Sequence, residues 1–378
     1  MQRQVFIPPL HEAPLPPPAH ASVIRLSGAT MGTHWQVDLV LSTAKDKSEA
    51  EQQSAQSAWA TQKTSLQAGI QTQLDQVVTQ MSTWDSQSDL CQFNRAAAGS
   101  WIPLAPEFFK VLDYAVFLAQ QTRGAYDPAA ARLVDLWGFG PKGKRQDCPD
   151  DAAIQEARDT PGWRSLQLRR LTGEALQVGG VQLDLSSIAK GFGVDQVARY
   201  LNQQQIGSYL IEVGGELRGH GVKPDGQPWW VSIEQAGLEQ QEQQEQIRDA
   251  ENVLQTARMN DAMHNHLLAL HGMSVATSGN YRQYFDVEGR RYAHTIDARS
   301  GYPVSHDLCS VTVLHPECMI ADALATALFV MGADEGMQYA NQHQLAVLFV
   351  RGIHSDTETK HPHHIEESMS QALIAMLD

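Results

Sequence analysis

Two oxygen-bearing side chains stand four residues apart near the end of the chain. Asp322 and Thr326 lie in the segment MIADALATALFVMG, whose apolar pattern predicts a helix, so both side chains project from one helical face. A carboxylate and a hydroxyl are hard ligands, and Mg²⁺ usually completes its octahedron with water and substrate phosphates. The pair suits a metal that arrives with a phosphorylated ligand, although Asp322 could instead cap the helix or face solvent.

A histidine and a lysine supply the other candidate groups. His294 stands three residues before Asp297 in AHTIDARSGYP, and a histidine can act as a base near neutral pH while a nearby carboxylate orients it. Lys190 stands one residue before Gly191 at the predicted helix start in AKGFG, where its ammonium can reach a phosphate as a point charge. Thr277 and Ser278 in SVATSGNY can hydrogen-bond a ligand. Each of these also has an ordinary structural explanation, as a strand histidine, a surface lysine and a turn.

The elements that must position these groups mix strands with helices. Residues 176–187 alternate like a strand and run into a helical pattern over 188–205, and such a junction presents free N–H groups to an anion. Residues 23–41 read as one strand, and residues 70–81 and 319–332 as helices. Because strands and helices do not alternate regularly, we expect an α+β fold of mixed sheets with packed helices.

Composition excludes several classes of protein. The chain has 378 residues and a formal net charge of −15, which disfavours a nucleic-acid partner because phosphate backbones repel an acidic surface. There is no apolar run long enough to span a bilayer, so no integral membrane segment is expected. The four cysteines lack metal-site spacing and are predicted to be reduced thiols. The missing GxxxxGK and GxGxxG motifs argue against P-loop and Rossmann sites.

The two ends and one internal stretch differ from the rest. Residues 1–21 are proline-rich and predict an extended N-terminal arm. Residues 235–266 are dominated by Gln and Glu and predict an insertion, either a solvated helix or a disordered loop. The N-terminus shows neither an apolar signal region nor a lipobox cysteine, which predicts a cytoplasmic location.

Seven blocks along the chain resemble, in order, the pattern of the ApbE family of FAD:protein FMN transferases. They are MGTHWQV, MSTWDSQSDLCQFNR, GAYDPAAARLVDLWGFG, DLSSIAKGFGVD, LIEVGGELRGHG, SVATSGNYRQYF with RRYAHTIDARSGYPV, and SVTVLHPECMIADALATALFVMG. The resemblance implies a family domain over residues 22–352, followed by a tail at 353–378. It further implies an ApbE-like, T-fold-like unit with FAD in a groove between two lobes.

The resemblance also assigns the candidate site residues. It implies that FAD contacts a set of residues from several blocks, and that Gly193 approaches the ligand closely. Mg²⁺ would be held by the side chains of Asp322 and Thr326 and by the backbone carbonyls of Ser187 and Ala325. His294 would be the catalytic base, assisted by Lys190. The other FAD-binding residues would be Met31, Trp84, Ala125, Tyr126, Asp127, Asp184 and Ile296.

The implied reaction transfers the FMN half of FAD to a threonine or serine hydroxyl of another protein and releases AMP. The implied partner is a flavoprotein carrying a short Thr/Ser motif, such as an FMN-binding-domain subunit of an electron-transfer complex. Many relatives are exported, which conflicts with the cytoplasmic expectation. An FAD pyrophosphatase that forms FMN and AMP, or a non-catalytic FAD-binding protein, are the alternatives.

Overall fold

A computed structural model describes the chain over most of its length. The described residues are 4–10, 12–18, 20–42, 49–145, 147–233, 266–280, 284–287, 290–353 and 364–377. The insertion expected at 235–266 lies outside them except for its last residue, His266, which begins a strand. Among the described residues, no helix is long and apolar enough to cross a bilayer.

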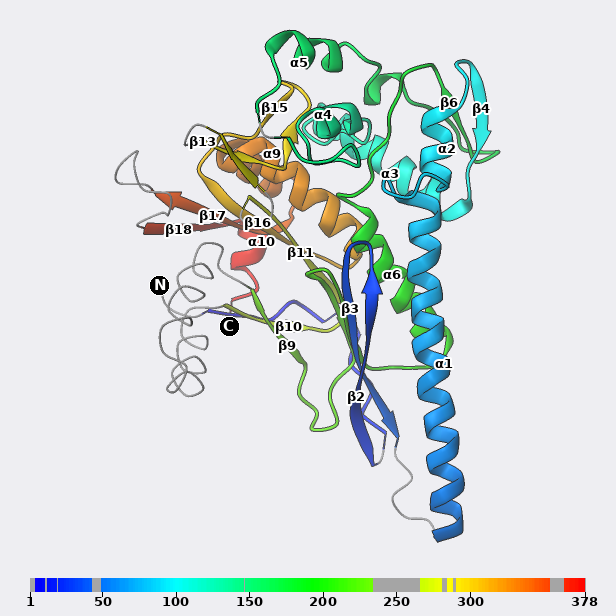
Figure 1. Cartoon of the computed structure of the whole chain (residues 1–378). Coiled ribbons are helices and arrows are strands. Elements are labelled where there is room, and N and C mark those ends of the chain that lie inside the picture. Colours follow the sequence, from blue (N-terminus) through cyan, green and yellow to red (C-terminus); the bar gives the residue numbers. More distant parts are fainter. Residues whose placement is uncertain are drawn as a thin grey trace.

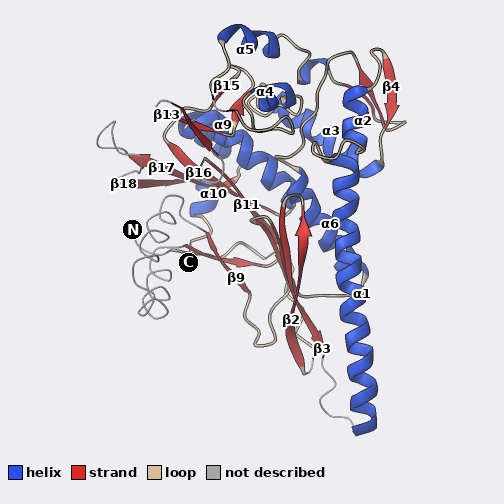
Figure 2. Ribbon diagram, viewed as in Figure 1, coloured by secondary structure: helices blue, strands red, loops and turns tan. Residues whose placement is uncertain are grey.

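An antiparallel sheet of eight strands forms the centre of the fold (Figure 1, Figure 2). Its strand order is β18, β17, β16, β11, β8, β7, β3 and β2. The strands are β2 (Ala21–Thr30), β3 (Thr33–Ser42), β7 (Tyr209–Val213), β8 (Glu216–His220), β11 (Met273–Gly279), β16 (Leu308–His315), β17 (Ala346–Ile353) and β18 (His364–Met369).

Smaller sheets and the helices surround this centre. The small sheets are β1 (Val5–Phe6) with β10 (His266–Leu270) and β9 (Trp229–Ile233), β4 (Ser100–Pro103) with β6 (Glu174–Gln177) and β5 (Gln167–Arg169), and the hairpins β12 (Tyr284–Val287) with β13 (Arg290–Ala293) and β14 (Ile296–Asp297) with β15 (Tyr302–Pro303). The helices are α1 (Glu49–Met81), α2 (Asp89–Arg95), α3 (Pro106–Gln121), α4 (Ala131–Leu136), α5 (Asp151–Arg158), α6 (Ala189–Gln203), α9 (Cys318–Gln342), α10 (Gln371–Ile374) and the 3₁₀ helix η1 (Trp163–Ser165).

Long helices cover one face of the central sheet, and the sheet β1–β10–β9 covers the other. Alternation along β3 shows this division, because successive strand side chains point to opposite faces. Val37 and Leu39 pack with α1 and α6, whereas Val40 packs with Trp229 of β9 and Leu268 of β10. The arrangement confirms the predicted α+β class.

The segment predicted as one strand over residues 23–41 is a hairpin, so that prediction is wrong. β2 and β3 join at Met31 and Gly32, whose φ angles are 48° and 71°. Positive φ at both central residues defines a type I′ turn, which fits the twist of two antiparallel strands. Met31 is an unusual residue for this position, so the alternating pattern continues through the turn with little sign of a break.

The strand predicted over residues 176–187 is also too long. β6 ends at Gln177, and an extended loop without strand pairing leads from there to α6. Val181, Leu183 and Leu185 are nevertheless fully buried in the core beneath α9. Their alternation therefore reflects a loop lying on the core rather than a place in a sheet.

Two predicted helices are longer than their apolar patterns. The first was expected over residues 70–81, but α1 begins at Glu49. The last was expected to end at Gly332, but α9 continues to Gln342 across that glycine, where φ is 81° and the helix kinks. The kink leaves the straight first part of α9, which carries Asp322 and Thr326, packed against α6 and β11.

Candidate functional site

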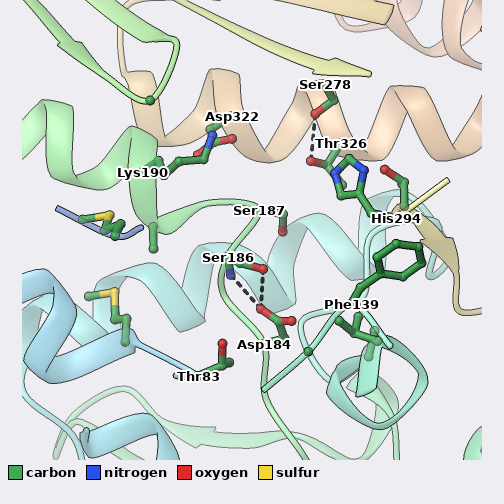
Figure 3. A pocket seen from close by; sticks show the side chains of 18 of the residues that line it. Thr83, Phe139, Asp184, Ser186, Ser187, Lys190, Ser278, His294, Asp322 and Thr326 are labelled. Carbon is green, nitrogen blue, oxygen red and sulfur yellow. Dashed lines mark hydrogen bonds between the residues drawn. The ribbon is translucent and has the colours of Figure 1, made fainter. Parts of the chain in front are cut away.

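A cavity of about 1050 Å³ opens beside the N-terminal end of α6 and the first part of α9. Its volume reaches the upper end of the range of about 300–1,000 Å³ that is common for small-molecule sites. All but two of the predicted site residues line it, and Figure 3 shows several of them together. These lining residues are Met31, Trp84, Ala125, Tyr126, Asp127, Asp184, Ser187, Lys190, His294, Ile296, Asp322 and Thr326.

One side of the cavity, here named the α6–α9 wall, consists of Lys190, Glu216, Ser278, Asp322 and Thr326. Asp322 is only 4% exposed, and its Oδ2 accepts a hydrogen bond of 2.9 Å from the backbone N–H of Gly191 in α6. One turn later, the Thr326 hydroxyl lies 3.0 Å from the hydroxyl of Ser278 in β11. The predicted spacing of four residues therefore does place both oxygens on one face of α9, toward the cavity.

Charge on the α6–α9 wall is concentrated in two carboxylates and one ammonium. The Lys190 ammonium pairs with Glu216, whose side chain is 2% exposed. Burial raises the pKa of Asp322, while the Lys190 charge and the Gly191 N–H oppose this rise by favouring the ionised form. With all three groups ionised the wall has one excess negative charge, which suits a bound cation. The sequence does not predict Glu216 as a site residue, because the only pattern that marks it is the glycine pair just before it.

The opposite side of the cavity, the loop wall, consists of Tyr126, Asp127, Asp184, Ser186 and Ser187. Asp127 Oδ1 accepts a hydrogen bond of 2.8 Å from Ala129 N–H. Asp184 Oδ1 accepts bonds from the N–H and the hydroxyl of Ser186, at 2.8 and 2.6 Å. Both carboxylates are thus held by residues two positions later, in the manner of Asx turns.

Burial governs the protonation of the loop wall. It raises the pKa of Asp127 to about 6, against the opposing effect of hydrogen bonds from the Ala129 and Trp163 backbone. Burial likewise raises the pKa of Asp184, although the bonds from Ser186 favour its ionised form. The Tyr126 hydroxyl accepts a hydrogen bond of 3.1 Å from Ser187 and its pKa is raised by burial, so it stays neutral.

His294 stands between β13 and β14 at the edge of the cavity, near Thr326 in Figure 3. Its ring meets that of Phe139 edge-on, with centroids 6.2 Å apart. The carboxylate of Asp297, considered above as an orienting group, forms an ion pair with Arg299 at 2.9 Å. Phe139, from the loop after α4, is therefore a neighbour of the imidazole that no sequence pattern indicates.

Two predicted site residues do not line the cavity. Gly193 lies inside α6, where an added Cβ would meet Leu74 of α1 at 3.1 Å and Met31 at 3.2 Å. Ala325 is fully buried within α9. The predicted role of Ala325 concerned its backbone carbonyl rather than its side chain, and both roles stay predictions.

The donor set fits a magnesium ion better than a metal held by protein ligands alone. Among the described residues, no group of three or more His, Cys, Asp or Glu side chains is placed to share a metal. The α6–α9 wall offers one carboxylate beside two hydroxyls, which are hard oxygen donors. Mg²⁺ takes few protein ligands of this kind and fills its sphere with phosphates and water.

Comparison with known proteins identifies the family of this chain. The family model described as the ApbE family matches residues 31–349. The FAD:protein FMN transferase of Vibrio cholerae is 36% identical over 330 residues, which cover 87% of this chain and 88% of that protein. The FAD:protein FMN transferase of Haemophilus influenzae is 34% identical over 336 residues, which cover 87% of this chain and 86% of that protein.

Solved structures show the same similarity. The apo form of the Pseudomonas stutzeri flavinyl transferase ApbE superposes with a TM-score of 0.74 at 31% identity, over 94% of this chain and 97% of that one. The flavin transferase ApbE from Vibrio cholerae gives a TM-score of 0.74 at 31% identity, over 94% and 100%. The family match includes the α6–α9 wall, the loop wall and His294, and the chain therefore belongs to the ApbE family and is a transferase.

Proposed function

We propose that this chain transfers the FMN half of FAD onto a threonine or serine hydroxyl of a target flavoprotein, in a Mg²⁺-dependent reaction that releases AMP. The supporting observation is that one cavity brings together a pair of hard metal ligands, a lysine, a histidine and two carboxylates of the loop wall. The relatives at 30–36% identity are named FAD:protein FMN transferases.

Asp322 and Thr326 would hold the metal with their side chains, and Ser187 and Ala325 would add backbone carbonyls. A Mg²⁺ ion held there would supply positive charge that stabilises the phosphoryl group during transfer. The Ser278 hydroxyl, 3.0 Å from that of Thr326, holds this ligand in place. Lys190 adds a point charge toward the phosphates while its pairing with Glu216 keeps the ammonium at the cavity surface.

The remainder of FAD would lie along the loop wall and its neighbours. Trp84 is 69% exposed and offers an aromatic face at the cavity margin, on which a flat ring can stack. Met31 and Ile296 supply apolar contact, and Ala125 to Asp127 and Asp184 supply polar groups. Gly193 acts indirectly in this proposal, because its lack of a side chain lets Met31 and Leu74 pack beside α6.

His294 would remove the proton from the acceptor hydroxyl as its oxygen attacks the FMN-side phosphorus. The new P–O bond forms while the bond from that phosphorus to the bridging oxygen breaks, and AMP leaves with the electron pair. The proton stays on the imidazole until it passes to solvent. Positioning and charge stabilisation supply most of the rate in phosphoryl transfer, and the two walls provide both.

The test is intact-protein mass spectrometry of a flavoprotein with a Thr/Ser motif after incubation with this chain, FAD and Mg²⁺. We expect a covalent FMN adduct that disappears with EDTA, with His294→Ala, and when the acceptor threonine or serine is replaced by valine or alanine. Release of FMN and AMP without an adduct would establish a pyrophosphatase instead. Intact FAD throughout would leave a non-catalytic FAD-binding protein.

A further inference from the structure

Helices α6 and α9 each begin without a capping side chain of their own. The N-cap residues Ile188 and Glu317 form no side-chain cap hydrogen bond. Helix N-termini leave their first N–H groups without partners inside the helix, and a buried N-terminus needs acceptors from elsewhere. Both N-termini are buried here, where α6 and α9 meet.

Each helix receives its missing cap from an aspartate of the other helix. Asp195 of α6 accepts hydrogen bonds from the backbone N–H of Cys318 at 3.1 Å and of Met319 at 2.9 Å, at the start of α9. Asp322 of α9 accepts the bond from Gly191 N–H at the start of α6. Each aspartate lies four residues after an amide that the other caps, so the two contacts form a reciprocal pair.

The reciprocal caps require close contact between the two helices. A Cβ at Gly191 would overlap the carbonyl of Cys318 and lie 2.8 Å from Cβ of Asp322. Glycine therefore allows α6 and α9 to approach closely enough for each aspartate to reach the other helix. Each carboxylate also lies at the positive end of a helix dipole, which stabilises its ionised form.

Strand β8 holds this pair of helices from the sheet. Glu216 and Arg218 are two residues apart in β8 and therefore point to one face of the sheet. Glu216 pairs with Lys190 of α6, while Arg218 donates 2.6 Å hydrogen bonds to Asp195 and to the carbonyl of Pro316, just before α9. The strand thus contacts both α6 and the start of α9 through groups of opposite charge.

We infer that Asp195, oriented by Arg218, is a positioning residue for the Asp322–Thr326 pair. Asp195 is 8% exposed, does not line the cavity and lies next to no substrate group in the proposed reaction. By fixing the start of α9 against α6, it sets where the Asp322 carboxylate stands relative to Lys190 and the cavity. This inference rests on the proposed metal role of Asp322 and Thr326.

The test measures metal affinity rather than turnover. Mn²⁺, which favours the same oxygen ligands as Mg²⁺, is titrated into the full chain with ADP as a pyrophosphate-bearing probe, and free Mn²⁺ is counted by electron paramagnetic resonance. A mixture of Mn²⁺ and ADP without protein gives the background. Asp195→Ala should weaken Mn²⁺ binding about 10-fold or more, the range found when a group that orients a metal ligand is removed.

Two milder variants cover the case in which Asp195→Ala does not fold. Asp195→Asn keeps one acceptor oxygen for the α9 amides and should lose less affinity than the alanine variant. Arg218→Gln leaves both caps in place and should weaken binding by about 3-fold through poorer orientation of Asp195. Each should also raise the Mg²⁺ concentration needed for half-maximal FMN transfer more than it lowers the maximal rate.

Asp38→Asn is the matched control, because it removes a buried carboxylate from an ion pair with Arg25 on β2 and β3, away from the cavity. It should lower thermal stability while leaving Mn²⁺ affinity within about 2-fold of the unsubstituted chain. If Asp322→Ala abolishes Mn²⁺ binding but the folded Asp195 and Arg218 variants bind as the control does, the positioning role is wrong. If Asp322→Ala binds Mn²⁺ normally, the proposed metal site itself is wrong.

Discussion

The two walls of the cavity hold their carboxylates by opposite means. On the loop wall, Asp127 and Asp184 each accept hydrogen bonds from a residue two positions later in the chain, and Asp127 accepts one more from the Trp163 backbone. On the α6–α9 wall, Asp322 is bonded by Gly191, which is 131 residues away. A carboxylate that is hydrogen-bonded within its own turn keeps its local geometry when the loop moves. The position of a carboxylate that is hydrogen-bonded to another helix depends on how the two helices pack.

This difference assigns different tasks to the two walls. A metal ligand must be placed to within a fraction of an ångström, and packed helices provide that rigidity. A binding loop can instead adapt to the ligand that it contacts. We therefore expect substitutions on the α6–α9 wall to abolish chemistry, and those on the loop wall to change binding and pH dependence by degrees.

Removing the metal carboxylate should have the largest effect. Asp322→Ala takes away the one acidic ligand proposed for Mg²⁺, and we expect FMN transfer to fall by about 1,000-fold or more, since a catalytic metal supplies several kcal/mol of charge stabilisation. Mass spectrometry of the acceptor over time measures the rate. Asp334→Ala, on the exposed end of the same helix, should retain full activity; equal loss in both variants would contradict the assignment.

Removing the proposed base should have the next largest effect. His294→Ala should slow transfer by at least about 100-fold, the lower end for loss of a general base, while leaving FAD affinity nearly unchanged. Rapid-quench measurement of AMP release and FAD fluorescence titration separate the two. His343→Ala, an exposed histidine at the end of α9, is the control, and a normal rate for His294→Ala would rule out its role as base.

The close contact between α6 and α9 can be broken with one methyl group. Gly191→Ala should destabilise the fold by about 1–3 kcal/mol, as overpacking does in a tight core, and should also weaken metal binding because Asp322 moves. Gly207→Ala is the control, since a Cβ there meets nothing within 4 Å. Chemical denaturation measures the free energy of unfolding of the two variants. Equal values would show that α6 can shift to accommodate the methyl group at no cost in stability.

Asp127 of the loop wall should make the stability of the protein depend on pH. Because burial raises the pKa of Asp127 to about 6, the folded protein binds this proton more tightly than the unfolded chain does. The protonated Asp127 side chain therefore stabilises the folded state fully below about pH 4. This stabilisation is lost as the pH rises through about 6. Asp127→Asn cannot ionise, so it should gain on the order of 1–3 kcal/mol over the unsubstituted chain between these pH values.

Urea denaturation of both proteins across this pH range measures the change. Asparagine can still accept the hydrogen bond from Ala129, so the turn itself should persist at every pH. A stability difference that stays constant from pH 4 to pH 7 would mean that Asp127 is ionised throughout and that its surroundings are more polar than its burial indicates.

Much of the site was accessible from the chain alone. The spacing of Asp322 and Thr326 predicts their common face, which the structure confirms. The orientation of His294 by Asp297 stays a prediction; the Asp297 carboxylate also lies 2.9 Å from Arg299, two residues later. Glu216 escaped notice because a lone glutamate after two glycines has no distinctive pattern until Lys190 lies beside it.

Residues close together in the sequence determine the local features of this protein. These are the helical face that presents Asp322, the Asx turns at Asp127 and Asp184, and the apolar periodicities of α1 and α9. Nearby residues leave open the Met31 turn, whose left-handed φ is stabilised by packing against two cores. The reciprocal caps of Asp195 and Asp322 join residues 123 and 131 positions apart. Such contacts form only when α6 and α9 pack together, because a hydrogen bond acts over about 3 Å. They therefore leave no pattern in the sequence near either residue.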